Sequence, residues 1–342
     1  MATSLLALSR RVICAILGML MLMAAAPLPS RSAEPGHIAL QQVQDYPLPG
    51  RATRWDYMSL DASRNRLFIA HLGDSAVVVI DTKDKSVVGT IAGVSDVHGV
   101  LVIPELGRAY ASATGSNEVV AIDTASLQII ARMPAGKYPD GLAYAPDMHK
   151  LYVSDEYGKA ETVIDVRSNR RVKTIPLGGE AGNTQYDPVS RHIFVNVQTS
   201  AELIEIDPAT DSVMQRIRLP GAAGNHGLLI EPFLRLAFIA CEGNGKLLVL
   251  DLRTKKPRQA LDVGGSPDVL AYDPGLGMLY VATEAGILYR FRVGPNEVVK
   301  ADEVRVGSNA HTVAVNPDTH EVFLPLKQKG KQPVLRVMRP KP

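Results

Sequence analysis

An internal repeat of about 42 residues constrains this chain more than any other feature. An aspartate closes an apolar run at Asp81, Asp123, Asp165, Asp207 and Asp251, with gaps of 42, 42, 42 and 44 residues. A repeat of this length, built from short alternating segments and turn residues, is typical of one blade of a β-propeller. Seven such units fit the chain. The sequence therefore predicts an all-β, seven-bladed β-propeller of four-stranded antiparallel blades.

Each unit has the same internal order of expected strands. A first strand ends in a turn rich in Asp and Pro, and an apolar second strand follows it. The second strands are expected at residues 67–70, 109–112, 151–154, 193–196, 237–240, 279–282 and 322–325. The third strand ends in the marker aspartate, and a more polar fourth strand closes the unit.

The seventh unit lacks a fourth strand, and the N-terminus offers a replacement. Residues 37–50, HIALQQVQDYPLPG, have the pattern of the other fourth strands and end in the same Pro-Gly pair. Pairing this segment with the last unit would close the ring and remove unpaired strand edges. We therefore expect residues 34–342 to form a single β-propeller domain closed by its N-terminal strand.

Residues 1–33 have the pattern of a secretory signal peptide. Arg10 and Arg11 precede an apolar stretch at 12–26, which is short for a membrane span. Cleavage after Ala26 and cleavage after Ala33 both fit, and so do general secretion and twin-arginine export. A retained anchor is the alternative. We expect a periplasmic or secreted protein with no membrane span once the signal is removed.

Charge and cysteine content limit the partners of the exported chain. Removing the three arginines Arg10, Arg11 and Arg31 with the signal changes the formal charge from +2 to −1. Such a chain has no global field that attracts nucleic acid, so a nucleic-acid partner is not expected. Cys14 leaves with the signal, and Cys241 is interpreted as a small core residue. We expect a monomer that binds a small molecule or a periplasmic protein.

Several segments resemble the YVTN-repeat (YncE-like) β-propeller family. The resemblance rests on LYVS, IFVN and LYVA, on PDGLAYAPD at Pro139–Asp147 and on the I-D-T/P turns, and it covers about residues 37–339. It implies an exported seven-bladed propeller and no single activity. The sixth unit departs from the pattern, because Arg292 replaces the marker aspartate. WD40 repeats match poorly, because Trp55 is the only tryptophan.

One position near the start of each first strand is rich in ionisable groups. The first strand of a blade lines the central channel, so equivalent positions form a ring around the axis. The occupants are Asp56, His98, Asp140, Gly182, His226, Asp268 and His311, with Asn183 beside the glycine. We therefore predict a ligand-binding channel mouth made of Asp56, His98, Asp140, Asn183, His226, Asp268 and His311.

Two interpretations of this ring stay open. In the first, His98, His226 and His311 bind a divalent or redox-active metal ion, the aspartates orient the imidazoles, and Gly182 leaves a notch for a ligand. In the second, the short polar side chains satisfy backbone N–H groups of the preceding loops and recur because the repeat was duplicated.

Two other charged sets are interpreted as structural. The five marker aspartates are followed by turn residues, so we expect them to cap turns and not to bind calcium. Residues 326–342 carry six basic residues and no acid. Since aromatic residues for base stacking are missing there, a solvated loop and strand is favoured over an edge that binds polyanions. The six are Lys327, Lys329, Lys331, Arg336, Arg339 and Lys341.

These observations lead to two hypotheses about function. The first is an exported, non-catalytic binding scaffold that presents its top face and channel mouth to a small ligand or a protein partner. The alternative is a metal-dependent enzyme of the lactonase, lyase or oxidoreductase type that uses the His/Asp ring of the channel mouth. Catalytic residues are not assigned.

Overall fold

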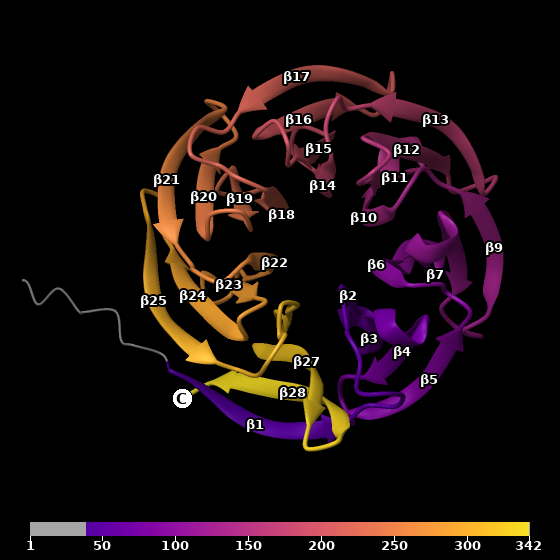
Figure 1. Ribbon diagram of the computed structural model, residues 1–342, viewed down its shortest axis with the longest axis vertical. Helices are drawn as coiled ribbons and strands as arrows, with labels where there is room; N and C mark the ends of the chain where they lie inside the picture. Colours follow the sequence, from indigo (N-terminus) through magenta and orange to yellow (C-terminus); the bar gives the residue numbers. More distant parts are fainter. Residues whose placement is uncertain (1–38, 342) are drawn as a thin grey trace, which may run out of the picture. The chain divides into compact units, whose positions relative to one another are not determined.

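The described residues form seven four-stranded antiparallel sheets arranged in a ring (Figure 1). The computed structural model describes residues 39–341. The predicted seven-bladed β-propeller is confirmed, and the only helical segments in this range are five single turns of 3₁₀-helix. The signal peptide expected at residues 1–33, and Cys14 within it, lie outside the described residues.

Blades 1 to 4 follow one another along the chain, each with its strands in sequence order from the axis outward. Blade 1 contains β2 (Met58–Asp61), β3 (Arg66–His71), β4 (Ala76–Asp81) and β5 (Ser86–Ala92). Blade 2 contains β6 (Val97–Ile103), β7 (Arg108–Ala113), β8 (Glu118–Asp123) and β9 (Ile129–Pro134). Blade 3 contains β10 (Pro139–Ala145), β11 (Lys150–Asp155), β12 (Ala160–Asp165) and β13 (Arg170–Pro176). Blade 4 contains β14 (Ala181–Asp187), β15 (His192–Val197), β16 (Glu202–Asp207) and β17 (Ser212–Arg218).

The remaining blades complete the ring. Blade 5 contains β18 (Asn225–Glu231), β19 (Leu236–Cys241), β20 (Lys246–Asp251) and β21 (Lys256–Asp262). Blade 6 contains β22 (Pro267–Asp273), β23 (Met278–Thr283), β24 (Ile287–Val293) and β25 (Val298–Arg305). Blade 7 contains β26 (Ala314–Asn316), β27 (Glu321–Lys329), β28 (Gln332–Pro340) and β1 (Leu40–Pro47). The 3₁₀ turns are η1 (Ala62–Arg64), η2 (Leu72–Asp74), η3 (Pro104–Leu106), η4 (Thr114–Ser116) and η5 (Pro146–Met148).

The N-terminal strand closes the ring as predicted. Strand β1 pairs antiparallel with β28, from Leu40 opposite Pro340 to Pro47 opposite Val334. The first and last strands of the described residues therefore lie side by side in blade 7 (Figure 1). Asp45 of β1 adds an ion pair across this seam, since its carboxylate lies 2.8 Å from the guanidinium of Arg336 and 2.7 Å from Nζ of Lys329.

The hydrophobic core lies between neighbouring blades. Because both faces of a blade are covered by its neighbours, the second and third strands are buried on both faces, and Leu67–Ala70 of β3 are all buried. Phe68 and Val79 of blade 1, for example, pack in one cluster with Val102 of blade 2. The fourth strands cover the perimeter, so most of their residues are exposed, as in β13.

The marker aspartates cap turns, as predicted. The Asp81 carboxylate accepts hydrogen bonds from the backbone N–H of Lys83 at 2.8 Å and of Asp84 at 3.0 Å. Backbone N–H groups two or three residues further on donate in the same way to Asp123, Asp165, Asp207 and Asp251. These carboxylates hold the turn between the third and fourth strands of five blades.

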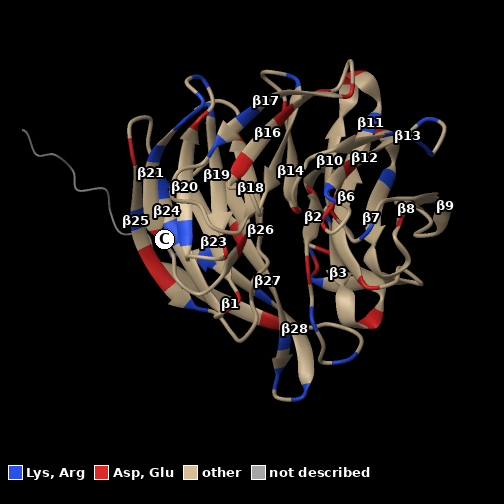
Figure 2. Ribbon diagram, turned by 45° about the horizontal axis from the view of Figure 1, so that its top comes forward, with Lys and Arg blue, Asp and Glu red and all other residues tan. Residues whose placement is uncertain are grey.

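Residues 326–341, for which the sequence predicts a solvated loop and a strand, form the end of β27, a tight turn and β28. Figure 2 shows basic residues along this hairpin. Three of the six basic side chains are paired, because Lys329 and Arg336 contact Asp45, and Arg339 lies 2.8 Å from Glu321. Half of these positive charges are therefore paired with carboxylates of blade 7 itself.

Cys241 is a core residue at the end of β19, as predicted, and burial raises the pKa of its thiol to about 11. Between residues 39 and 341, no helix has the length and hydropathy needed to cross a membrane.

Candidate functional site

A β-bulge holds the predicted ring position in five of the seven blades. In β6, Val97 pairs with Ala113 and Val100 with Ala111, so His98 and Gly99 together face Ser112. The register shifts at the same place in β10, β14, β18 and β22. A bulge bends its strand and changes the direction of the side chains within it. In these five blades, the bulge turns the side chain at the ring position toward the channel mouth.

In blades 2 and 5 the neighbouring first strand approaches so closely that the residue after the ring position must be glycine. A Cβ atom on Gly227 would lie 1.9 Å from the carbonyl oxygen of Asp268, and one on Gly99 would lie 2.1 Å from that of Asp140. Gly182 has a similar role, because a Cβ there would lie 2.8 Å from the carbonyl oxygen of His226. The expected ligand notch at Gly182 is therefore wrong, since the backbone of β18 takes that space.

The ring side chains surround a small cavity at the channel mouth. Asp56, His98, Asp140, His226 and Asp268 all line this cavity of about 160 Å³. Asn183 lies deeper and lines a separate cavity in the channel, next to Gly141. His311 is fully buried behind the wall, with Nε2 3.9 Å from Asp56 and 4.0 Å from Asp268. The structure thus brings six of the seven predicted residues together at one level.

His226 is surrounded by acids and one phenol. Its Nε2 lies 3.0 Å from the Tyr57 hydroxyl, 3.4 Å from Asp140 and 3.8 Å from Asp268. Burial alone would lower the pKa of His226, but the two carboxylates outweigh it and raise the pKa to about 10. Burial also raises the pKa of the Asp268 carboxyl, to about 7, although His226 opposes this rise.

His311 and Asp56 form the opposite side of the cluster. His311 donates from Nδ1 to the Asn309 carbonyl oxygen at 3.1 Å, and its Nε2 has no hydrogen-bond partner. Burial would lower its pKa, but Asp56 raises it to about 9. For Asp56, burial acts to raise the pKa, and His311 outweighs burial and holds the pKa below its ordinary value.

His98 is held differently from the other two histidines. Its Nδ1 donates to the Asp96 carbonyl oxygen at 2.9 Å, and its Nε2 lies 3.0 Å from the Tyr138 hydroxyl. Both ring nitrogens therefore have protein partners. Tyr138 in turn packs against Tyr157, with ring centroids 4.4 Å apart, so this side of the mouth is aromatic.

A second ring of polar residues, which sequence reasoning missed, lies beside the first. Glu156, Gln198 and Glu242 line the same cavity as His226, and Glu284 contacts His311. Each follows a ring position by 16 residues, at the turn after the second strand of its blade. The same 42-residue spacing that found the first ring could have found this one. Burial, followed by Asp140, raises the pKa of Glu156 to about 7.

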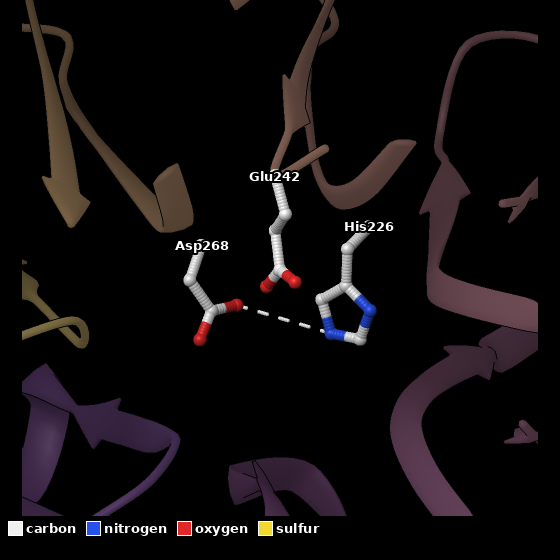
Figure 3. Close-up of side chains that lie close together, drawn as sticks. All are labelled: His226, Glu242 and Asp268. Atoms are coloured by element: carbon white, nitrogen blue, oxygen red, sulfur yellow. Dashed lines mark ion pairs between the residues drawn. The ribbon is translucent and has the colours of Figure 1, made fainter. Parts of the chain in front are cut away.

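Two groups of three side chains in residues 39–341 have ligand atoms within 4.8 Å of one another. They are His226 with Glu242 and Asp268, and His311 with Glu284 and Asp268. Figure 3 shows His226, Glu242 and Asp268 pointing toward a common space, with the ion pair between His226 and Asp268 dashed. The predicted set of His98, His226 and His311 does not form one such group, and metal binding by that set stays a prediction.

The ring aspartates do not act as caps of the preceding loops. No backbone N–H among the described residues donates to Asp56, Asp140 or Asp268. Moreover, Oδ1 of Asp140 and Oδ1 of Asp268 are buried without any hydrogen-bond partner. Buried carboxylate oxygens are normally hydrogen-bonded, and exceptions call for a reason such as an ion. Because these two oxygens have no hydrogen-bond partner, a ligand-binding role is favoured over a role in capping the backbone of the loops.

Comparisons with known proteins define the fold class. No protein-family profile and no curated protein matches the chain. The structure is similar to a chain of hydrazine synthase from Kuenenia stuttgartiensis, with TM-score 0.73 and 17% identity, over 84% of this chain and 96% of that one. It is also similar to a chain of the mitotic checkpoint complex, with TM-score 0.75 and 14% identity, over 97% and 99%. A third similarity is to the WD40 repeats of RRP9, with TM-score 0.75 and 10% identity, over 88% and 100%.

Identities this low show the fold alone. Together with the sheet topology, they place the chain in the class of seven-bladed β-propellers. Membership of the YVTN-repeat family stays a prediction, and fold similarity transfers no activity.

Proposed function

We propose that this protein is an exported binding propeller that holds one divalent transition-metal ion at its channel mouth, with His226, Glu242 and Asp268 as ligands. An imidazole with two carboxylates suits ions such as Mn²⁺, Fe²⁺ and Zn²⁺. The observation that carries the proposal is Oδ1 of Asp268. This oxygen is buried and has no hydrogen-bond partner, and its ion-pair partner, Nε2 of His226, lies 3.8 Å away.

Glu242 supports the proposal because its carboxylate is available. Among the described residues it makes no hydrogen bond or ion pair, although its oxygen lies within 4.8 Å of the other two ligand atoms. A metal about 2.0–2.2 Å from each ligand requires ligand atoms roughly 3.5 Å apart. The group must therefore contract on binding, and the half-buried Glu242 carboxylate can move inward without breaking a hydrogen bond or ion pair.

Space for a small molecule adjoins the cavity that the metal ligands line. A larger cavity of about 520 Å³ shares Arg54, His98 and Tyr138 with the cavity at the mouth. Three protein ligands leave coordination positions open on a transition-metal ion. The proposal therefore includes a small ligand that reaches the ion through this aromatic side of the mouth.

One observation favours the enzyme hypothesis as the second candidate. The Tyr57 hydroxyl lies 3.0 Å from Nε2 of His226, beside the proposed ion. Burial raises the pKa of Tyr57 well above its ordinary value, so the phenol keeps its proton. It could donate a hydrogen bond to a water or substrate oxygen on the metal, which is a role that hydrolytic metal sites need.

Elemental analysis of protein purified without added metal tests the proposal. We expect one metal per chain in the wild type and in His98→Ala, and loss of the metal in His226→Ala and Glu242→Gln. His192→Ala is the matched control, because this histidine pairs with Glu205 in blade 4 away from the mouth. Metal-free wild type after dialysis against Zn²⁺ or Mn²⁺ would refute the proposal. Metal loss in His98→Ala would instead support the three-histidine set.

A further inference from the structure

The two three-residue groups at the mouth form similar halves that share Asp268. One half offers His226 and Glu242, and the other offers His311 and Glu284. In each half the histidine belongs to the first ring and the glutamate to the second. If only the types of ligand atom are considered, each half could hold one metal ion, and Asp268 would bridge the two ions.

The halves differ in whether a protein cation already occupies them. NH1 of Arg54 lies 2.7 Å from Oε1 of Glu284, and Nε of Arg54 lies 3.4 Å from Asp56. The second oxygen of Glu284 accepts a hydrogen bond from the Asn309 amide. In the other half, no Lys or Arg of the described residues pairs with Glu242, Asp140 or Asp268.

Arg54 is an exception within the repeat. It stands two residues before the ring position of blade 1, and none of its equivalents is basic. Those equivalents are Asp96, Tyr138, Glu180, Gly224, Ser266 and Asn309. A guanidinium keeps its charge at any physiological pH and repels a second cation at short range.

We propose that Arg54 is a built-in cation that fills the His311 half of the mouth and limits the protein to one metal ion. This inference rests on the proposed function. His311 supplies the independent sign that this half could bind a ligand, because its Nε2 is fully buried and has no hydrogen-bond partner. Arg54 thus determines how many metal ions the mouth binds. The two halves together have the ligands of a two-metal site, in which the guanidinium of Arg54 occupies the second metal position.

Zn²⁺ titration by calorimetry, with metal content measured after dialysis, tests the inference. We expect one Zn²⁺ per chain in the wild type and in Arg54→Lys, and two in Arg54→Met, with the second site at least 100-fold tighter than any second binding to the wild type. Arg54→Met combined with His311→Ala should return to one. Arg51→Met is the matched control, since Arg51 pairs with Asp74 outside the mouth.

The outcomes separate this inference from the proposed function. One ion in both wild type and Arg54→Met overturns the inference alone, and so do two ions in the wild type. No ion in the wild type but one in Arg54→Met overturns the proposed function and also the stated stoichiometry, because Arg54 would then exclude every metal ion from the mouth. No ion in either protein overturns both. Arg54→Gln carries the same expectation if Arg54→Met fails to fold, as judged by its unfolding transition.

Discussion

A buried carboxylate outside the channel mouth makes the stability of this propeller depend on pH. Glu161 of β12 is fully buried, and neither of its carboxylate oxygens has a hydrogen-bond partner. Burial, followed by the nearby Asp155, raises its pKa well above the ordinary value. The folded state therefore holds this proton more tightly than the unfolded chain does, and stability falls as the pH rises above about 4.3, the usual value for Glu.

Glu161→Gln should remove this pH dependence. Because glutamine is neutral and of similar size, we expect the variant to exceed the wild type by roughly 1–3 kcal/mol at pH 8, with the difference shrinking toward pH 4. Urea denaturation between pH 4 and 8 measures it. Glu105→Gln, at an exposed turn position, should show no such trend. A variant less stable than the wild type at pH 8 would contradict the account.

Gly227 allows blades 5 and 6 to meet, so Gly227→Ala should damage both stability and the mouth. The added Cβ would lie 1.9 Å from the Asp268 carbonyl oxygen, and the backbone would have to shift at a cost of about 1–3 kcal/mol or more. Gly107→Asn is the control, since nothing lies within 4 Å of that Cβ position. Equal melting temperatures for Gly227→Ala and the wild type would show that the strands are not packed this closely.

At the scale of elements, the seam between β1 and β28 closes the molecule. Arg336, with a further contribution from Lys329, lowers the pKa of Asp45 to about 2. A carboxylate with a lowered folded pKa stabilises the fold at neutral pH, and this contribution is lost as the pH falls from about 4 through 2.

Asp45→Asn should therefore destabilise the protein by about 1–3 kcal/mol at pH 7, because hydrogen bonds to a charged partner are lost. The difference from the wild type should vanish near pH 2. Chemical denaturation at pH 7 and at low pH measures both values. Asp84→Asn changes an exposed aspartate on blade 1 and should have little effect. A constant difference at all pH values would argue against an ionic seam.

The sequence predicts the strands and the ring closure because both depend on repeated local patterns. Each apolar segment such as 151–154 is buried on both faces, and Leu40–Pro47, within the predicted segment 37–50, completes an otherwise three-stranded unit. The ring of Asp56, His98 and their equivalents could be found for the same reason. The grouping of His226 with Glu242 could not, since it depends on bulges and side-chain directions that spacing does not encode.

At the scale of the whole molecule, the closed ring gathers side chains that are far apart in the chain. Arg54 and Glu284 are separated by 230 positions, yet their side chains form an ion pair. A metal bound to residues of blades 5 and 6 should stabilise the folded protein. At a free Zn²⁺ concentration 100 times the Kd, we expect a gain of about 2.7 kcal/mol for the wild type. His226→Ala should show no gain, and an equal gain in both proteins would place the ion elsewhere.

Anomalous diffraction from crystals soaked in Zn²⁺ tests the central claim most directly. The account predicts one strong peak at about 2.0–2.2 Å from Nε2 of His226 and from oxygens of Glu242 and Asp268, with Arg54 still paired to Glu284. A mouth without a peak, or a peak bound only to residues outside it, would contradict the account.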